Sequence, residues 1–226
     1  MDSPTCIIHL PERQPDSAII WLHGLGADAH DLEPISAALA LDTTRSLFPN
    51  APRREITINN GTEMRAWFDF TSLDFSGGEN TEHIAASIER VETLINAQID
   101  QGMAAERIIL AGFSQGGVIA LMTGLGFDQP LGGIMALSTY IPEQIPLDIE
   151  QLIPVIQCHG INDSVIPYEV GQLTSKRLHA VLGELHEWRT YPMEHEVSGQ
   201  EISDLANWAQ RLLGSPASGQ TQQGVG

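Results

Sequence analysis

The sequence predicts one α/β domain in which a mostly parallel central sheet is covered by helices on both faces. Short, often β-branched apolar runs alternate with longer amphipathic, Ala-rich segments, and Gly, Pro or polar turns bound the runs. The length of 226 residues allows one sizeable core and is short for two domains. Strands are expected at 5–10, 18–22, 44–48, 107–111, 133–137, 155–158 and 187–191, and helices at 31–40, 81–101, 115–125, 168–182 and 200–213.

The helix predictions rest on amphipathic spacing, which is clearest in segment 81–101. Apolar side chains recur there at helical intervals, so one stripe of the helix is expected to pack on the sheet. Strands buried on both faces by such helices are typical of parallel sheets. The stripe consists of Ile84, Ile88, Val91, Leu94 and Ile95.

Two segments break the alternation of strands and helices. Segment 49–78 is rich in Asn, Gly and Thr and too long for a simple connection, so it is expected to be functional or to carry small elements of its own. Segment 214–226 consists mostly of Gly, Ser, Gln and Ala with almost nothing to bury, which predicts a disordered tail. The predicted organisation is therefore a single domain at 1–213 followed by a tail at 214–226.

The composition limits the classes of partner. With 29 acidic and 11 basic side chains, the formal net charge of −18 repels phosphate backbones and anionic lipids, so nucleic-acid binding is not expected. No apolar run approaches the roughly 18 residues that span a bilayer, so stable membrane insertion is not expected either. Cys6 and Cys158 form neither a ligand pair nor a disulfide framework, and no secretory signal is recognisable, which together indicate a cytoplasmic protein.

A candidate nucleophile, Ser114, lies in the pattern Gly112-x-Ser114-x-Gly116. The bare pattern is weak, but an apolar strand runs into it and an amphipathic helix leaves it, as a nucleophile elbow requires. The glycines leave room for the unfavourable backbone conformation of the serine, whose hydroxyl then stands at the carboxyl edge of the sheet. This context predicts the α/β-hydrolase fold, and an ordinary Gly-rich turn is the alternative.

Two backbone amides are candidates for an oxyanion hole. One is the N–H of Gln115, which follows the nucleophile, and the other should come from the loop after an early strand. That loop reads HGLG at 23–26, and the glycines around Leu25 allow close approach to a ligand. We therefore assign the second donor to Leu25, with a turn that merely reverses the chain as the alternative.

His195 is the candidate general base among eight histidines. In α/β-hydrolases the acid and then the histidine follow the nucleophile, each after a later strand. His195 follows the last predicted strand, whereas no acid-bearing loop separates His159 from the nucleophile helix. Asp163 follows strand 155–158 and can hold the His195 tautomer, although an aspartate here could instead cap the next helix.

Together these residues resemble the phospholipase/carboxylesterase family, which includes bacterial carboxylesterases and acyl-protein thioesterases. The resemblance covers about residues 17–213. It rests on six motifs in order: HGLGAD at 23–28, RSLFPNAP at 45–52, MRAWFD at 64–69, GFSQGG at 112–117, HGxxDxxIP at 159–167 and YPMxH at 191–195.

The resemblance implies Ser114, Asp163 and His195 as catalytic triad and the amides of Leu25 and Gln115 as oxyanion hole. It also suggests that Trp67 and segment 49–78 shape an acyl-binding groove, with a core role for Trp67 left open. A homodimer is left open as well.

One departure from the family pattern lies beside the base. Glycine usually precedes the catalytic histidine, whereas Glu194 and Glu196 flank His195 here. Nearby carboxylates favour the imidazolium and would shift the loss of activity on acidification to a higher pH. Alternatively, Glu194 points into solvent and changes little.

The expected activity is cleavage of small-molecule esters with short to medium acyl chains through an acyl-enzyme, without metal or organic cofactor. Segment 139–154 is too short for a large cap domain, which favours a shallow, open groove. Three alternatives stay open: an acyl-protein thioesterase, a lysophospholipase, and a non-catalytic binding protein on the same fold.

Overall fold

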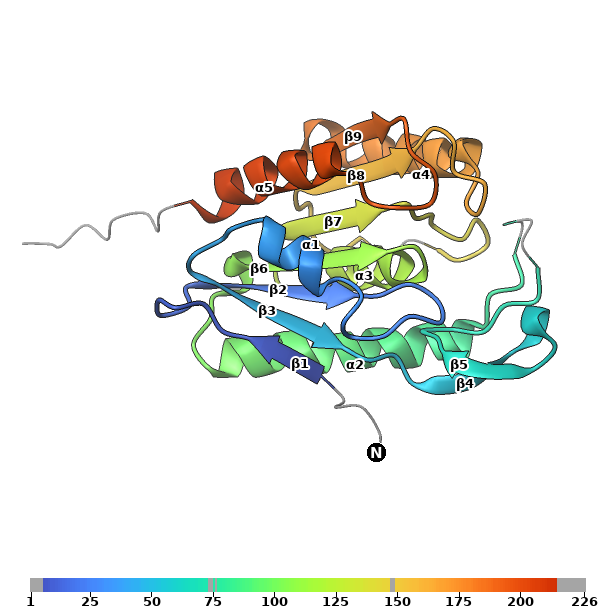
Figure 1. The fold of residues 1–226 in the computed structure, drawn as a ribbon, viewed down its shortest axis with the longest axis horizontal. Coiled ribbons are helices and arrows are strands. Elements are labelled where there is room, and N and C mark those ends of the chain that lie inside the picture. Colours follow the sequence, from blue (N-terminus) through green and yellow to red (C-terminus); the bar gives the residue numbers. More distant parts are fainter. Residues whose placement is uncertain (1–5, 73–74, 76, 147–148, 215–226) are drawn as a thin grey trace, which may run out of the picture.

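A seven-stranded sheet forms the centre of the computed structural model, which describes residues 6–72, 75, 77–146 and 149–214. The strand order is β1-β3-β2-β6-β7-β8-β9, and β1 runs antiparallel to β3 while the other neighbours are parallel (Figure 1). The predicted α/β-hydrolase fold with a mostly parallel sheet is confirmed. The strands are β1 Cys6–His9, β2 Ser17–Leu22, β3 Thr44–Pro49, β6 Ile108–Phe113, β7 Gly133–Leu137, β8 Val155–Gly160 and β9 His186–Tyr191.

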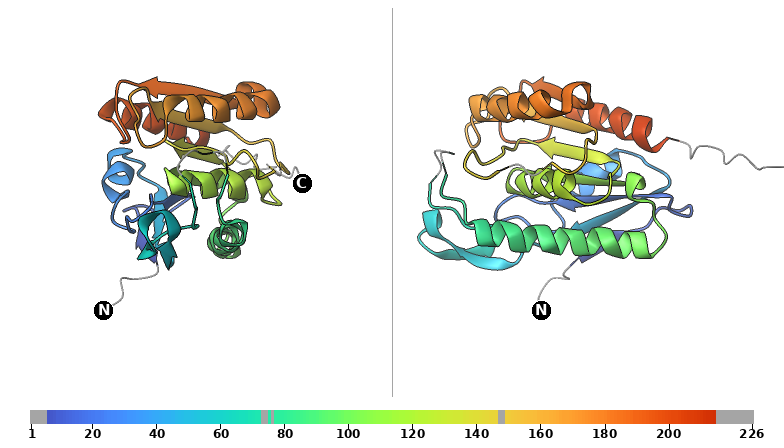
Figure 2. Two further views of the ribbon diagram at one scale, coloured as in Figure 1. Left: turned by 90° about the vertical axis from the view of Figure 1, so that its right-hand side faces the viewer. Right: turned by 180° about the vertical axis from the view of Figure 1, so that it is seen from behind.

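Helices cover both faces of this sheet, which gives the predicted three layers. The long helices α2, Thr81–Asp100, α3, Gln115–Gly126, and α4, Tyr168–Leu182, lie on one face. The other face carries α1, Glu33–Ala38, and α5, Gly199–Leu213 (Figures 1 and 2). Helix α1 is shorter than the predicted 31–40, and Ala40 just beyond it has a left-handed backbone with φ of 49°.

The core lies in two layers, one on each side of the sheet. Successive side chains of β2 alternate between them: Ala18, Ile20 and Leu22 pack toward α2 and α3, whereas Ile19 and Trp21 pack toward α1 and α5. Burial on both faces explains why this strand is a continuous apolar run. The predicted apolar stripe of α2 lies in the first of these layers.

Segment 49–78 carries small elements of its own, as expected from its length, although the sequence did not identify them as strands. Strands β4, Arg53–Ile56, and β5, Thr62–Arg65, form an antiparallel hairpin, and a short 3₁₀ helix, Thr57–Asn59, lies between them. The hairpin lies beyond the carboxyl ends of the parallel strands (Figure 1), so this excursion builds one side of the edge where Ser114 lies. Two further 3₁₀ helices are Ala105–Arg107 and Gly183–Leu185.

The described structure ends at Gly214. Gly214 follows α5 and donates its N–H to the carbonyl of Gln210 at 2.8 Å, whereas the rest of the predicted tail lies outside the described residues. Within the described ranges, no helix combines the length and apolar character needed to cross a bilayer.

Candidate active site

Ser114 occupies a strained turn between β6 and α3. Its backbone has φ of 53° and ψ of −119°, a conformation that non-glycine residues rarely adopt. Hydrogen bonds to the chain at and after the end of β7 hold it: the Ser114 N–H donates to the carbonyl of Leu137 at 2.9 Å, and the hydroxyl of Thr139 donates to the Ser114 carbonyl at 2.7 Å. The end of β7 therefore stabilises the conformation that presents the serine.

The glycines of this turn are required by close backbone contacts. A methyl group on Gly112 would overlap the carbonyl of Gly116, and one on Gly116 would overlap the carbonyl of Leu22. A methyl group on Gly117 would lie 2.5 Å from the Cβ atom of Thr139. The motif thus lets β2, β6 and α3 approach closely enough to bring the loop after β2 beside Ser114.

The loop after β2, which carries Leu25, is held by buried groups. The Nδ1 atom of His23 lies 2.7 Å from the carbonyl of Gly24, and its Nε2 atom accepts the N–H of Ala51 at 3.1 Å, so the ring is neutral with its proton on Nδ1. Burial also lowers the pKa of His23. The N–H of Gly26 donates to Arg65 at 2.9 Å. None of the hydrogen bonds of the described residues uses the Leu25 N–H, and Leu25 lines the cavity beside Ser114.

Gln115 contributes both a backbone and a side-chain function. As the first residue of α3, its N–H belongs to the turn in which helix amides have no intrahelical partner. Its side-chain oxygen accepts the N–H of Trp67 at 2.8 Å, and its side-chain nitrogen donates to the carbonyl of Phe68 at 2.7 Å. The side chain therefore fastens the distant segment 67–68 to the nucleophile turn, a role that the sequence motif did not reveal.

The predicted base and acid are hydrogen-bonded to each other. The Nδ1 atom of His195 lies 2.7 Å from Oδ2 of Asp163, and the other carboxylate oxygen accepts the N–H groups of Val165 and Ile166 at 2.9 and 2.8 Å. The Asp163 side chain is fully buried, whereas that of His195 is 15% exposed. An acceptor on Nδ1 fixes the tautomer that leaves Nε2 free to take a proton.

His159, which topology argues against as a base, lies beneath this pair. Its Nε2 atom is 2.9 Å from the carbonyl of Ile166 and 3.5 Å from Oδ2 of Asp163, and the ring is completely buried. Burial lowers the pKa of His159, so the ring is neutral and donates to Ile166. The imidazole thereby holds the turn that positions Asp163, and its place in the HGxxD motif is the signal that could have suggested this.

Glu194 and Glu196 are both exposed beside His195. Within the described chain, the carboxylate that hydrogen-bonds His195 belongs to Asp163 and to neither of these residues. The exposure of Glu194 matches the alternative in which it points into solvent.

A cavity of about 280 Å³ opens beside Ser114 and His195. Its inner wall is aromatic: Phe75 and Tyr140 meet edge to face with ring centroids 4.9 Å apart, and Phe68 and Phe70 lie 6.2 Å apart. The hydroxyl of Tyr140 donates to Glu79 at 2.9 Å, which joins the loop after β7 to the excursion after β3. The cavity is therefore suited to an apolar chain that ends at Ser114.

The suggested groove-lining role of Trp67 needs correction, because Trp67 is fully buried and does not line this cavity. Its indole N–H donates to the carbonyl of His23 at 2.9 Å, and its own carbonyl accepts the hydroxyl of Ser87. Trp67 thus lies in the core and supports the loop of Leu25. Among the described residues of the 49–78 excursion, those that line the cavity are Ile58, Phe68, Phe70 and Phe75.

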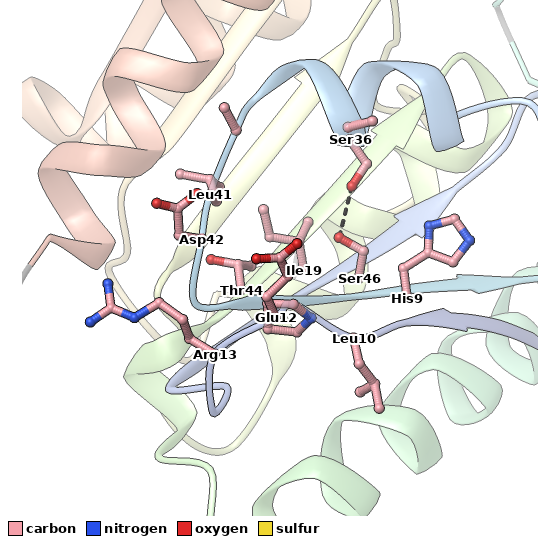
Figure 3. A pocket seen from close by; sticks show the side chains of 13 residues that line it. His9, Leu10, Glu12, Arg13, Ile19, Ser36, Leu41, Asp42, Thr44 and Ser46 are labelled. Atoms are coloured by element: carbon pink, nitrogen blue, oxygen red, sulfur yellow. Dashed lines mark hydrogen bonds between the residues drawn. The ribbon is translucent and has the colours of Figure 1, made fainter.

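A larger cavity, of about 650 Å³, lies elsewhere, between α1, β3 and the turn after β1. The hydroxyls of Ser36 and Ser46 point toward one another there and are 2.7 Å apart (Figure 3). It shares no residue with the cavity at Ser114, so size alone does not identify the reaction centre. Among the described residues, no three His, Cys, Asp or Glu side chains gather closely enough to hold a metal ion.

Comparison with known proteins gives one consistent result. Residues 4–213 match the model of the Phospholipase/Carboxylesterase family. Acyl-protein thioesterase 1 of Mycosarcoma maydis is 34% identical over 88% of this chain and 92% of its own, and that of Cryptococcus neoformans is 32% identical over 93% and 99%. The crystal structure of Arabidopsis thaliana SOBER1 superposes with a TM-score of 0.78 at 31% identity, covering 87% of this chain and 99% of that one. The chain therefore belongs to the phospholipase/carboxylesterase family of serine hydrolases.

Proposed function

We propose that the protein is a carboxylesterase that cleaves esters of short to medium acyl chains, with Ser114 as nucleophile, His195 as general base and Asp163 as its partner. The observation that carries this proposal is the 2.7 Å hydrogen bond between Asp163 and His195 at the rim of the cavity that contains Ser114. The strained turn of Ser114 supports it, because such strain persists where the surrounding structure enforces it.

The reaction proceeds by two acyl transfers. Nε2 of His195 takes the Ser114 proton while Oγ attacks the ester carbonyl, and the imidazolium then gives that proton to the departing alcohol. Water attacks the resulting acyl-serine by the same route and releases the acid. The N–H groups of Leu25 and Gln115 stabilise the negative oxygen at each step, and losing one such donor typically costs about 10²–10³ in rate.

The dimensions of the cavity support the choice of acyl group. Its 280 Å³ lies just below the range of about 300–1,000 Å³ that is typical of small-molecule sites. Aromatic side chains from the excursion and from the loop after β7 line it. A short or medium chain fills this space, whereas a long chain must extend along the surface.

A thioesterase activity is the second candidate, because the two fungal relatives above are named acyl-protein thioesterase 1. Oxygen esters and thioesters use the same nucleophile, base and oxyanion hole, so the triad does not separate them. The acidic surface, with a net charge of −18, favours a lysophospholipase activity less, because lysophospholipids carry an anionic phosphate.

A cytoplasmic location completes the proposal. Cys6 and Cys158 are both free, which suits a reducing compartment. Burial raises the pKa of the Cys158 thiol well above its usual range, so this residue is chemically inert.

The test is hydrolysis of p-nitrophenyl esters of increasing chain length beside matched acyl thioesters, with Ser114→Ala as control. We expect the highest kcat/KM for short to medium oxygen esters and a loss of at least about 10³-fold in the variant. Preference for long thioesters would assign protein deacylation instead. Turnover that survives in Ser114→Ala, or no turnover of either series, would contradict the proposal.

A further inference from the structure

A second, smaller cavity adjoins the acyl cavity at His195. Its volume is about 240 Å³, and it lies between the start of α1 and the loop that follows His195. It shares Asp31, Phe113 and His195 with the acyl cavity, and the rings of Phe113 and His195 pack against each other with centroids 4.7 Å apart. These two rings therefore form the partition between the cavities.

The position of the second cavity beside His195 suits it to bind the leaving group, which is the alcohol part of the ester. Ser114, Gln115 and Leu25 line the acyl cavity but not the second one. The atom that leaves must receive its proton from His195, so it has to lie on the histidine side of the carbonyl carbon. An ester bound with its acyl chain against the aromatic wall thus directs its alcohol toward the second cavity.

The lining of this second cavity combines apolar and negatively charged groups. Leu32, Ile35 and Val197 supply aliphatic surface, whereas Asp31 and Glu196 supply carboxylates. No lysine or arginine lines it. An alkyl group would contact the aliphatic surface, and a positive charge would be attracted by the two acids.

The electrostatic environment of Asp31 points the same way. Partial desolvation and the neighbouring charge of Asp28 raise the pKa of Asp31, and no cationic side chain contributes to lowering it. A cationic ligand beside Asp31 would offset the repulsion between these two carboxylates.

Building on the proposed esterase function, we propose that the second cavity is the leaving-group subsite and that Asp31 and Glu196 make it select small alcohols or thiols carrying an ammonium group on a short alkyl arm. Asp31 and Glu196 are then specificity-determining residues. Ester cleavage itself requires neither carboxylate, since the proton transfers run through Ser114 and His195.

The test compares butyrylcholine with 3,3-dimethylbutyl butyrate, which has nearly the same shape but carries carbon in place of the quaternary nitrogen and so lacks the charge. Because the cation also activates its ester, each kcat/KM is first divided by the rate constant for alkaline hydrolysis of the same ester. The quantity measured is the ratio of their kcat/KM values, from which any effect on His195 itself cancels. We expect the wild-type ratio to be about three to ten at low salt, the size of one or two exposed ion pairs. Because such pairs are screened, the ratio should approach one in about 0.5 M NaCl.

Asp31→Asn and Glu196→Gln should each lower this ratio, and the double variant should reduce it at least twofold. The matched control is Glu194→Gln, which removes an exposed carboxylate beside His195 that does not line the cavity and should leave the ratio unchanged. A wild-type ratio below three, a ratio that high salt does not lower, or one that the double variant retains would overturn the inference. The salt series needs no variant, so it decides the matter even if a substitution prevents folding.

The outcome for the proposed function is read separately, from Ser114-dependent turnover of p-nitrophenyl butyrate. Turnover with no preference for the cation would overturn the subsite and leave the esterase intact. Absence of turnover would overturn both.

Discussion

The two halves of the proposed reaction centre, the Ser114 side and the His195 side, are held by different kinds of contact. On the Ser114 side, the restraints are backbone packing, amides and hydroxyls, as in the contact of Gly116 with Leu22 and the bond from Thr139 to Ser114. On the His195 side, the restraints are ionisable groups, since Asp163 bonds His195 and lies 3.5 Å from His159. The Ser114 side is therefore sensitive to added volume, whereas the His195 side is sensitive to the exchange of one hydrogen-bonding group for another.

A second layer of ionisable groups lies behind the His195 loop. Glu201, in the first turn of α5, is completely buried, and neither of its carboxylate oxygens has a hydrogen-bond partner among the described residues. It faces the Cys158 thiol and the charge of Asp204, and burial above all raises its pKa to about 8. Asp204 in turn accepts the hydroxyl of Tyr191 at 3.0 Å. The loop that carries His195 therefore joins β9 to α5, and the first turn of α5 contains the protonated carboxyl group of Glu201.

The largest loss of stability and activity is expected on the Ser114 side, from Gly116→Ala. The added methyl group would overlap the carbonyl of Leu22 and displace both the end of β2 and the loop of Leu25. We expect destabilisation of about 3 kcal/mol or more and loss of esterase activity. The measurements are urea unfolding and p-nitrophenyl butyrate turnover. Gly199→Ala is the control, because nothing lies within 4 Å of the added methyl group there; near-wild-type activity of Gly116→Ala would contradict this account.

Asp163→Asn should abolish the function of His195 as a base while preserving the shape of the turn that carries residue 163. The side-chain oxygen can still accept the N–H groups of Val165 and Ile166, which turns the amide nitrogen toward His195. That nitrogen donates to Nδ1 and leaves the proton on Nε2, the wrong tautomer for a base. We expect kcat to fall by about 10³–10⁴ with little change in unfolding free energy. A loss smaller than tenfold would show that Asp163 does not orient His195.

Gln115→Leu should have an intermediate effect, because it keeps the backbone N–H and removes the two side-chain bonds to Trp67 and Phe68. Unpaired buried groups cost about 1–3 kcal/mol each in stability. Because Phe68 is then no longer held in the wall of the acyl cavity, kcat/KM should fall roughly tenfold and depend less on the length of the acyl chain. Gln98→Leu is the matched control: it removes a bond to Arg45 far from the cavity and should destabilise without altering that profile. Identical profiles in both variants would refute the role of the Gln115 side chain.

Glu201→Gln should change activity least of these variants, and its main effect should be on how the free energy of unfolding depends on pH. From the ordinary pKa of 4.5 to the folded value of about 8, the folded protein keeps a proton that the unfolded chain has lost. The wild-type free energy of unfolding therefore falls as pH rises through this range and levels off above it. The variant lacks this slope, so its stability relative to wild type should be higher at pH 8.5 than at pH 5, on the order of 3 kcal/mol.

Urea unfolding at these two pH values measures the effect of Glu201→Gln. The exposed Glu184→Gln serves as control and should follow the wild type at both. Parallel curves for Glu201→Gln and wild type would show that the Glu201 carboxyl is not held protonated.

The sheet and the main helices were predictable because apolar periodicity follows directly from burial on one or both faces. Strand β2 and the apolar stripe of α2 are examples. The turn of Ser114 was predictable for another reason, because its glycines are required by close backbone contacts. Hairpin β4–β5 escaped prediction because its strands are short and mostly exposed, so they carry no apolar pattern.

The side-chain contacts of the site were less accessible from sequence. Two examples are the hydrogen bonds from the Gln115 side chain to segment 67–68 and the contact of His159 with Asp163. In both, polar groups find partners that only the folded chain defines. Trp67 shows the same limit, since a tryptophan near a site is compatible with either a groove or a core position, and burial decided for the core.

Whether Ser114 is the nucleophile is tested most directly by mass spectrometry of the protein after reaction with a fluorophosphonate. We expect one phosphonyl group per chain, attached to Ser114, with labelling slowed strongly in Asp163→Asn and absent in Ser114→Ala. An adduct on another residue, or no adduct in protein that is folded, would contradict a Ser114 nucleophile and with it the proposed chemistry.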